Sequence, residues 1–285
     1  MAYVISTINL KGGVGKTQTT IAISEFLASS FGKRVLIIDL DPQTNATVSL
    51  MDETRWLNMD KKGNTIFQLF SDKVYGTEVF DINSSIVKNV SNIDSGIQNL
   101  DLLPSSLRLI DIQDKLPLVS NSGYFVKTPI TILKDSLGSI LENYDYVMID
   151  CPPNLGLITL AGIYISDYYI IPTVPDILST YGIPQILTRI NSFKKDTGIP
   201  IKPLGIVISM YRSNNRLHDS IIDSLKYRER KGDYPRIFEP YIPLSVRVSE
   251  AAEFQTGAAT LGQKYGYELA DRYTKLVREI IKYVE

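Results

Sequence analysis

A glycine-rich segment near the start of the chain, K-G-G-V-G-K-T at residues 11–17, limits the possible folds more than any other feature. Residues 3–9 before it are β-branched and mostly apolar, which predicts a buried parallel strand. Residues 17–28 after it have the apolar spacing of a helix. Glycines let the backbone curl so that successive N–H groups point inward, and the helix N-terminus adds its positive dipole. The order strand, loop, helix therefore predicts a site for a phosphate group, such as the β-phosphate of a nucleotide.

Two side chains of this loop have expected partners. Lys16 would reach the β- and γ-phosphates and the hydroxyl of Thr17 would hold Mg²⁺, which matches G-x-x-x-x-G-K-[ST] if Asn9 stands slightly displaced from the first glycine position. The neighbours of Lys16 would complete the cofactor site: Gly12, Gly13, Val14, Gly15 and Gln18. A glycine-rich turn without a ligand is the alternative, but the strand and the helix that the motif requires are both present.

Alternating strands and helices predict an α/β fold, in which helices cover both faces of a parallel sheet. Further strands are expected at residues 33–39, 100–104, 144–150, 168–173 and 204–209, and helices at 129–142, 183–195 and 267–285. Residues 50–130 hold short apolar fragments with many Ser and Asn, and we interpret them as a variable, insert-like region. We expect residues 1–285 to form one domain with a mildly basic part at 201–285, where 14 Lys and Arg stand against 11 Asp and Glu.

Aspartates stand at the ends of two expected strands. Asp150 ends an apolar strand before a Pro-Pro turn, in the manner of a Walker B segment, whose carboxylate binds Mg²⁺ through a water. Asp39 and Asp41 end the strand beside the glycine loop, and open parallel sheets bind ligands at such ends. A surface aspartate is the simpler explanation of Asp150, but the buried type of the residues before it favours the metal role.

A lysine at the first position of the glycine loop, Lys11, makes the chain similar to the deviant Walker A ATPases of the ParA/MinD family, in the ParA-like branch that partitions or positions cargo. D-L-D-P-Q-T-N-A-T at residues 39–47 resembles the first switch segment of that family, and C-P-P-N at 151–154 resembles the second. The resemblance covers essentially the whole chain, least clearly its middle third. It implies a P-loop fold with a mostly parallel, twisted sheet, the cofactors ATP and Mg²⁺, and an ATP-bound homodimer.

The resemblance also implies roles for single residues. Lys11 would reach the phosphates bound by the other subunit and would be catalytic together with Lys16. Asp41, also catalytic, would orient or deprotonate the attacking water, while Asp39 would help Thr17 and Asp150 to order the shell of the metal. Because positioning and charge stabilisation carry most of phosphoryl transfer, we expect low basal ATPase activity.

The wall around the adenine is a further expectation from the resemblance. Pro243, in the segment at residues 241–251, would contact the base, and Met210 would lie at the neighbouring strand end. An ordinary loop that enters a helix also explains that segment. Gln18 departs from the threonine that is usual after the motif in this family, which affects only details around the intact Thr17.

Basic residues with interleaved tyrosines gather between residues 212 and 236. Phosphate contacts from such a patch bind DNA without reading its sequence and weaken with salt. A solvated helix face is the simpler explanation. The resemblance favours nonspecific double-stranded DNA, bound once ATP has joined two subunits. The expected DNA-binding residues are Arg212, Arg216, Lys226, Arg228, Arg230, Lys231 and Arg247.

Two functional classes follow from the resemblance. The first is a nucleoid-associated ATPase that positions a plasmid, a chromosome or a protein organelle such as a carboxysome, stimulated by a ParB-like or McdB-like adaptor. The second is a MinD-like, membrane-associated regulator. The charges of residues 267–285 are balanced, so we expect a core-covering helix and no membrane attachment. Metabolic ligases of the same fold are a third class, and they generally lack an equivalent of Lys11.

The sequence also yields expectations for the cellular location and for the single cysteine and the single histidine. No run approaches the roughly 18 apolar residues of a membrane span, and a core strand at the N-terminus predicts a cytoplasmic protein. Cys151 is the only cysteine, which excludes an internal disulfide or a cysteine-built cluster within one subunit; we expect it to be a small buried side chain. His218 is the only histidine and is expected at the surface near basic neighbours.

Overall fold

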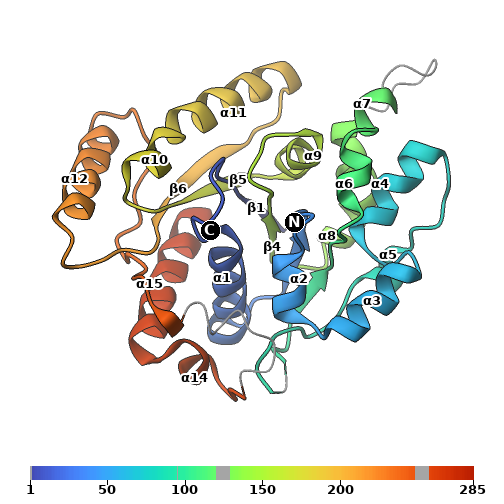
Figure 1. Cartoon of the computed structure of the whole chain (residues 1–285), viewed down its shortest axis with the longest axis horizontal. Coiled ribbons are helices and arrows are strands. Elements are labelled where there is room, and N and C mark those ends of the chain that lie inside the picture. Colours follow the sequence, from blue (N-terminus) through green and yellow to red (C-terminus); the bar gives the residue numbers. More distant parts are fainter. Residues whose placement is uncertain (1, 95, 120–128, 248–256) are drawn as a thin grey trace.

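The computed structural model describes residues 2–94, 96–119, 129–247 and 257–285. Within these residues the strands form one six-stranded, fully parallel sheet in the order β3-β2-β4-β1-β5-β6 (Figure 1). The strands are β1 Tyr3–Thr7, β2 Val35–Asp39, β3 Leu100–Leu103, β4 Tyr146–Asp150, β5 Tyr168–Thr173 and β6 Lys202–Ile208. The expectation of an α/β fold with a parallel sheet is confirmed.

Helices connect the strands and cover the sheet. They are α1 Lys16–Phe31, α2 Asn45–Leu50, α3 Glu53–Lys61, α4 Ile66–Tyr75, α5 Ile82–Ser85, α6 Leu109–Gln113, α7 Leu116–Val119, the 3-10 helix η1 Pro129–Thr131, α8 Ile132–Leu141, α9 Leu157–Ile165, α10 Ile177–Tyr181, α11 Ile183–Thr197, α12 Arg216–Arg230, α14 Leu261–Tyr265 and α15 Tyr267–Val284. These helices provide the crossover connections that parallel strands need.

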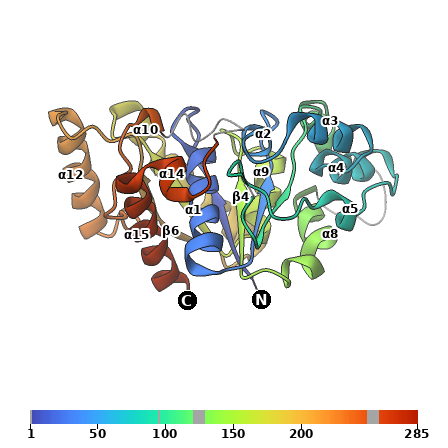
Figure 2. The same cartoon turned by 90° about the horizontal axis from the view of Figure 1, so that it is seen from below.

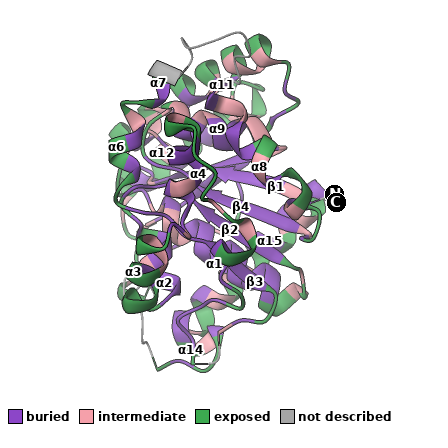
Figure 3. Cartoon of the chain, turned by 90° about the vertical axis from the view of Figure 1, so that its right-hand side faces the viewer, coloured by how far each residue is buried: buried purple, intermediate pink, exposed green. Residues whose placement is uncertain are grey.

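The central strands are buried on both faces because each face packs against helices (Figure 3). Side chains alternate along a strand, so Ile37 and Met148 join one core with α1 and α15. Val147 and Ile149 join the opposite core, to which α4, α8, α9 and α11 contribute. Apolar, largely β-branched strands such as these suit a sheet covered on both sides.

Strand register brings the expected site residues to one edge of the sheet. Strand β4 lies between β1 and β2, and Asp150 is the register partner of both Thr7 and Asp39. Figure 2 shows both chain ends on one side of the molecule and α2 and α10 on the other, the side toward which the parallel strands run. Loops at that edge therefore meet although they are far apart in sequence.

The C-terminal helix α15 covers the core as expected. The apolar positions of its inner face, Leu269, Tyr273, Leu276, Val277, Ile280 and Val284, are buried, and Ile281 is half-buried. The described part of the region at 50–130, interpreted from sequence as a variable insert, contains the short helices α3 to α7, but β3 in this region pairs with β2 and so extends the main sheet. None of the helices that the structure describes is both long and apolar enough to cross a membrane.

Two glycines allow a matched test of this packing. A Cβ at Gly205 in β6 would lie 2.5 Å from Phe238 Cε2, and Phe238 is fully buried. A Cβ at Gly138, exposed on α8, would meet nothing within 4 Å. We expect Gly205→Ala to lower the free energy of unfolding by about 1–3 kcal/mol through overpacking. Gly138→Ala should raise it by about 0.5–1 kcal/mol, because alanine favours the helix.

Urea unfolding followed by circular dichroism measures both changes. Equal effects of the two variants would contradict the packing described for β6.

Candidate nucleotide site

The glycine loop connects β1 to α1 and has the backbone geometry of an anion site. Gly13 and Gly15 have φ values of +74° and +79°, which only glycine adopts without strain. Gly15 caps α1, so the loop points free N–H groups and the positive end of that helix at one place. Gly12 and Gly13 are exposed, Gly15 is half-buried and Val14 is buried, which anchors the loop while leaving its glycines open to a ligand.

Side chains from outside the motif hold the loop in place. Asn9 accepts a hydrogen bond from the Lys11 N–H at 2.9 Å and donates one to the Pro172 carbonyl at 2.7 Å. Ser209, directly after β6, donates from Oγ to the Val14 carbonyl at 2.8 Å. The loop is therefore fixed to β5 and β6 before any ligand binds, so little ordering is needed on binding.

A hydroxyl and a carboxylate meet beside the loop. Thr17 Oγ1 donates to Asp150 Oδ2 at 2.7 Å, and Thr20 Oγ1 donates to Asp150 Oδ1 at 3.2 Å. Asp150 is fully buried, and burial raises its pKa above the usual carboxyl value. A carboxylate that is costly to keep charged, next to a hydroxyl and a phosphate loop, suits Mg²⁺, which keeps several waters and binds through few protein ligands. Groups of three or more His, Cys, Asp or Glu suited to a metal do not occur among the described residues.

Asp39, the last residue of β2, and Asp41 just after it hold the segment that resembles the first switch. Asp39 Oδ2 accepts from the Thr47 N–H at 3.0 Å and from Thr47 Oγ1 at 2.7 Å, and Asp39 Oδ1 accepts from the Asp41 N–H at 3.1 Å. Asp41 Oδ1 in turn accepts from the Gln43 N–H at 2.9 Å. Burial and the nearby charge of Asp150 raise the pKa of Asp39. Asp39 thus orders the loop that carries Asp41; its expected place in the metal shell stays a prediction.

The two lysines of the loop have different surroundings. Lys16 is buried, and burial lowers the pKa of its ammonium group although the charges of Asp150 and Asp41 act in the opposite direction. The side chain of Lys11 is 40% exposed, and its Nζ lies 2.9 Å from Ser179 Oγ and 3.4 Å from both carboxylate oxygens of Asp176. Lys16 therefore belongs to the interior of the site and Lys11 to its rim.

The residues expected around the adenine line one small pocket. Its volume is about 40 Å³, and its lining consists of Gly15, Gln18, Thr19, Ser209, Met210, Ile242, Pro243, Leu244, Ser245 and Tyr273. Met210 has φ +52°, an uncommon value for a residue with a side chain. Tyr211 and Pro243 form a parallel bridge that keeps the two walls together. A pocket of this size admits water, so a purine must push the lining apart. Residues 248–251 of the expected segment lie outside the described residues.

Comparisons with known proteins agree with this geometry. A family model described as an AAA domain matches residues 2–202. The sporulation initiation inhibitor protein Soj of Bacillus subtilis (strain 168) is 31% identical over 252 residues, which cover 88% of each chain. The chain belongs to the ParA/MinD family of ATPases.

Two further similarities concern function and nucleotide. The chromosome partitioning protein ParA of Caulobacter vibrioides is 28% identical to this ParA/MinD family member over 280 residues, 98% of this chain and 93% of that protein. The structure of cobyrinic acid a,c-diamide synthase from Mycobacterium smegmatis with bound ADP and magnesium is similar, with a TM-score of 0.69 and 27% identity, covering 95% of this chain and 93% of that one. Relatives of the chain thus include chromosome partitioning proteins.

Six of the seven basic residues expected to bind DNA lie on α12 of this ParA/MinD family member or close to its ends, and Arg247 lies in the later segment that follows Pro243. Lys226 is half-buried and the other six are exposed. Lys226 pairs with Glu239 at 3.0 Å, and Arg228 with Asp233 at 4.0 Å. Arg216 and Arg230, at the two ends of α12, have no ion pair within the described residues. Arg212, Lys231 and Arg247 likewise have no ion pair within the described residues, so Arg216 and Arg230 are distinguished by marking the two ends of one helix.

The structure corrects the expectation for His218, which is buried. It lies on the same side of α12 as Ile222 and Leu225, its ring packs 6.2 Å from that of Tyr211, and Nδ1 accepts from the Arg212 N–H at 3.2 Å. The spacing i, i+4, i+7 of these three residues indicates a shared buried helix face. The basic neighbours of His218 suggested an exposed position instead. Cys151 is fully buried as expected, and burial raises the pKa of its thiol, so it is no nucleophile.

Sequence reasoning also missed the residues that hold the site together from a distance. Asp176 and Ser179, which contact Lys11, form the N-terminal cap of α10: the Asp176 side chain accepts from the Ser179 N–H at 2.7 Å. An aspartate three residues before a serine at a helix start is a recognisable capping pattern. Ser105, whose N–H donates to Thr47 Oγ1 at 2.9 Å, had no such signal.

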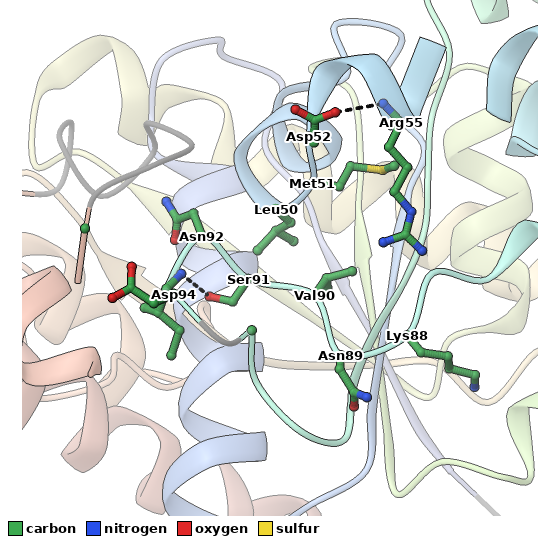
Figure 4. A pocket seen from close by; sticks show the side chains of 13 residues that line it. Leu50, Met51, Asp52, Arg55, Lys88, Asn89, Val90, Ser91, Asn92 and Asp94 are labelled. Atoms are coloured by element: carbon green, nitrogen blue, oxygen red, sulfur yellow. Dashed lines mark hydrogen bonds between the residues drawn. The ribbon is translucent and has the colours of Figure 1, made fainter. Parts of the chain in front are cut away.

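A larger pocket of about 470 Å³ lies away from the glycine loop, between the start of α3 and residues 88–96 (Figure 4). Its lining includes Asp52, which caps α3 by accepting from the Arg55 N–H, and Ser91. None of the expected site residues lines it.

The buried charge of Asp150 yields a prediction about stability. Its pKa is raised in the folded state, so the folded state binds the proton more tightly, and wild-type stability falls as pH rises from the usual carboxyl pKa through the raised one. Asp150→Asn removes that charge. We expect the variant without ligand to be more stable than wild type by about 1–3 kcal/mol at pH 8, a difference that disappears at low pH.

Thermal unfolding at several pH values measures this effect. Asp145→Asn is the matched control: its hydrogen bonds with Arg34 lower the pKa of Asp145, so its substitution should not stabilise the protein at pH 8. A destabilised Asp150→Asn variant at pH 8 would contradict the interpretation.

Proposed function

We propose that the protein is a Mg²⁺-dependent ATPase that dimerises with ATP, binds nonspecific DNA over the nucleoid in the cytoplasm, and positions or partitions a cargo. The observation that carries this proposal is the separation of the two loop lysines. Lys16 is buried beside Asp150 and Asp41, where it serves the nucleotide of its own subunit. Lys11 is at the rim, where its Nζ contacts Asp176 and Ser179 and where it can serve a second subunit.

The nucleotide chemistry follows from the same residues. The loop backbone and Lys16 hold the phosphates, Thr17 and Asp150 hold Mg²⁺, and Met210 and Pro243 enclose the base. A Mg²⁺ ion held by Thr17 and Asp150 would supply positive charge that offsets the charge developing on the phosphates. Asp41 orients the water while Asp39 holds its loop. The related synthase with bound ADP and magnesium supports the choice of cofactor.

The proposed DNA surface is α12 in both subunits of the dimer. Arg216 and Arg230 are 14 positions apart on this 15-residue helix, which places them about 21 Å apart along its axis. Each subunit offers few phosphate contacts, but a dimer doubles them, and the logarithm of affinity rises with their number. ATP-dependent dimerisation thereby controls DNA binding. The partitioning ParA relative supports a cargo on DNA, and a ParB-like or McdB-like adaptor is the proposed stimulator.

A MinD-like membrane role is the weaker candidate. The apolar side of α15 packs in the core against α1, and the outer side carries the balanced pairs Arg272–Glu268 and Lys275–Asp271. A membrane-binding tail needs a detachable apolar face and a cationic outer face. DNA is therefore the proposed surface, and no membrane.

The central prediction concerns the cycle of binding and hydrolysis. Lys11→Ala should lose ATP-dependent dimerisation and DNA binding, because the second subunit no longer contacts the phosphates. Asp41→Ala should retain ATP-dependent DNA binding and lose at least about 100-fold in turnover, since it keeps the phosphate contacts and lacks the group that orients water. Mobility shifts with ATP, ADP and no nucleotide, together with phosphate release, measure both.

The same assay includes liposomes as a second surface. Liposome binding with ATP in the absence of DNA binding would replace the proposal by the membrane role, and DNA binding that ignores nucleotide and both variants would refute the cycle.

The DNA surface has its own prediction. Arg216→Ala combined with Arg230→Ala should reduce the slope of log affinity against log salt by about 2 per subunit, and lower DNA affinity at least about tenfold at moderate salt. ATP binding should remain unchanged. Lys61→Ala with Lys62→Ala removes the same charge from an exposed part of the chain near the end of α3 and serves as the control. Fluorescence anisotropy with random duplexes at several salt concentrations gives the slopes; equal slopes for the two double variants would exclude α12.

A further inference from the structure

A fully buried ion pair lies behind the base pocket. Glu25, on the third turn of α1, and Lys264 of α14 have no exposed side-chain surface. Lys264 Nζ lies 2.7 Å from Glu25 Oε1 and 2.8 Å from Oε2. Such a pair contributes little net stability compared with apolar residues of the same size, so its presence invites a more specific explanation.

Two further side chains of the described residues donate hydrogen bonds to Glu25. Tyr265 donates its hydroxyl hydrogen to Oε2 at 2.7 Å, and Ser91 donates to Oε1 at 2.6 Å. The Ser91 oxygen accepts from the Ile93 N–H at 3.3 Å, the dashed contact beside Asp94 in Figure 4, so its own hydrogen is left for Glu25. An ionised carboxylate has no hydrogen to give, which fixes the direction of each of these bonds.

The direction of the hydrogen bond from Tyr265 to Glu25 also determines the orientation of the Gln18 carboxamide. Burial and the charge of Glu25 raise the pKa of the Tyr265 hydroxyl far above its ordinary value, so the hydrogen stays on Tyr265 and points at Glu25. The Tyr265 oxygen can then only accept. It does so from Gln18 Nε2 at 3.5 Å. The reverse orientation of the carboxamide would bring two acceptor oxygens together, so Gln18 Nε2 is held toward Tyr265.

The carboxamide oxygen of Gln18 has no hydrogen bond among the described residues, and Gln18 lines the base pocket together with Met210 and Pro243. Adenine carries an amino group, a donor, where guanine and hypoxanthine carry an oxygen, an acceptor. We propose that Gln18 selects adenine by accepting a hydrogen bond from its amino group, and that Tyr265 and Glu25 are positioning residues that keep the carboxamide in that orientation. This inference rests on the proposed function of the site as an ATP site.

The aromatic surroundings support the positioning role. The Tyr265 ring packs edge-on against Tyr273 with centroids 5.3 Å apart, and lies 5.7 Å from Phe26. Tyr273 itself lines the pocket. The hydroxyl of Tyr265 is thereby fixed from both sides, so the orientation of Gln18 is set before a base arrives.

The experiment compares the binding of ATP with that of ITP. ITP carries an oxygen at the position where ATP carries the amino group. Equilibrium titrations of both with Mg²⁺ should show about tenfold weaker binding of ITP to the wild-type protein, the loss of one hydrogen bond with an unfavourable contact in its place. Gln18→Met, which keeps the length of the side chain, and Tyr265→Phe, which frees the carboxamide to turn, should both reduce that ratio to about two or less.

Tyr144→Phe is the matched control, because it removes a buried hydroxyl that bonds Asp101, outside the base pocket and outside the chain of donors. Its ratio of ITP to ATP affinity should equal that of wild type. Equal affinity of the wild-type protein for ATP and ITP, or an unchanged ratio in both Gln18→Met and Tyr265→Phe, would overturn the inference and leave the ATPase proposal intact. Failure of the wild-type protein to bind either nucleotide would overturn the proposed function and the inference together.

Discussion

The hydrogen bond between Thr17 and Asp150 is the contact on which the site depends, since it joins the end of the glycine loop to the end of β4 across 133 residues of sequence. Only a parallel sheet with β4 beside β1 brings these two residues together, because parallel strands end at the same edge. The same neighbour relation puts Asp39 in register with Asp150. The fold thus concentrates buried carboxylates next to a loop with the opposite polarity, and that concentration is what makes the edge suitable for a metal and a phosphate chain.

The sequence predicted those parts of the site whose chemistry is local. The glycine loop, Thr17 and Asp150 could be found because each depends on a few adjacent residues and on the strand or helix beside them. Contacts such as Lys11 with Asp176 or Lys264 with Glu25 could not, since they span 165 and 239 residues and depend on which strands are neighbours. The expectation of an exposed His218 was wrong because it rested on the basic neighbours, whereas the helical spacing of His218, Ile222 and Leu225 indicates a buried position. Strand β3 shows the same limit: its apolar residues indicated a strand, but only its pairing with β2 shows that residues 50–130 extend the main sheet.

Several buried polar side chains around the site form hydrogen bonds whose direction is fixed. Asn9 accepts at one end and donates at the other, which positions both the glycine loop and β5. Glu25 accepts from every partner, which orients the side chains around it. Buried polar groups of this kind are costly when a single partner is missing, so they hold one arrangement strictly. The base end and the phosphate end of the site are each held in this way, and α1 carries residues of both.

The rim of the site differs from this rigid interior. The ion pair of Lys11 with Asp176 is half-exposed, and such pairs contribute about 0–1 kcal/mol. The helix that provides Asp176 also exposes Ile177, Leu178 and Tyr181 at 65%, 74% and 74%. Exposed apolar side chains grouped beside a weakly held lysine are typical of a surface that another protein covers. In the proposed dimer, a nucleotide on the second subunit would offer Lys11 several negative charges in place of one, and covering α10 would remove apolar surface from water at the same time. The charge gain requires a nucleotide on the facing subunit, which explains why the proposed dimer would form with ATP and separate after hydrolysis, while the apolar gain requires only contact between the subunits.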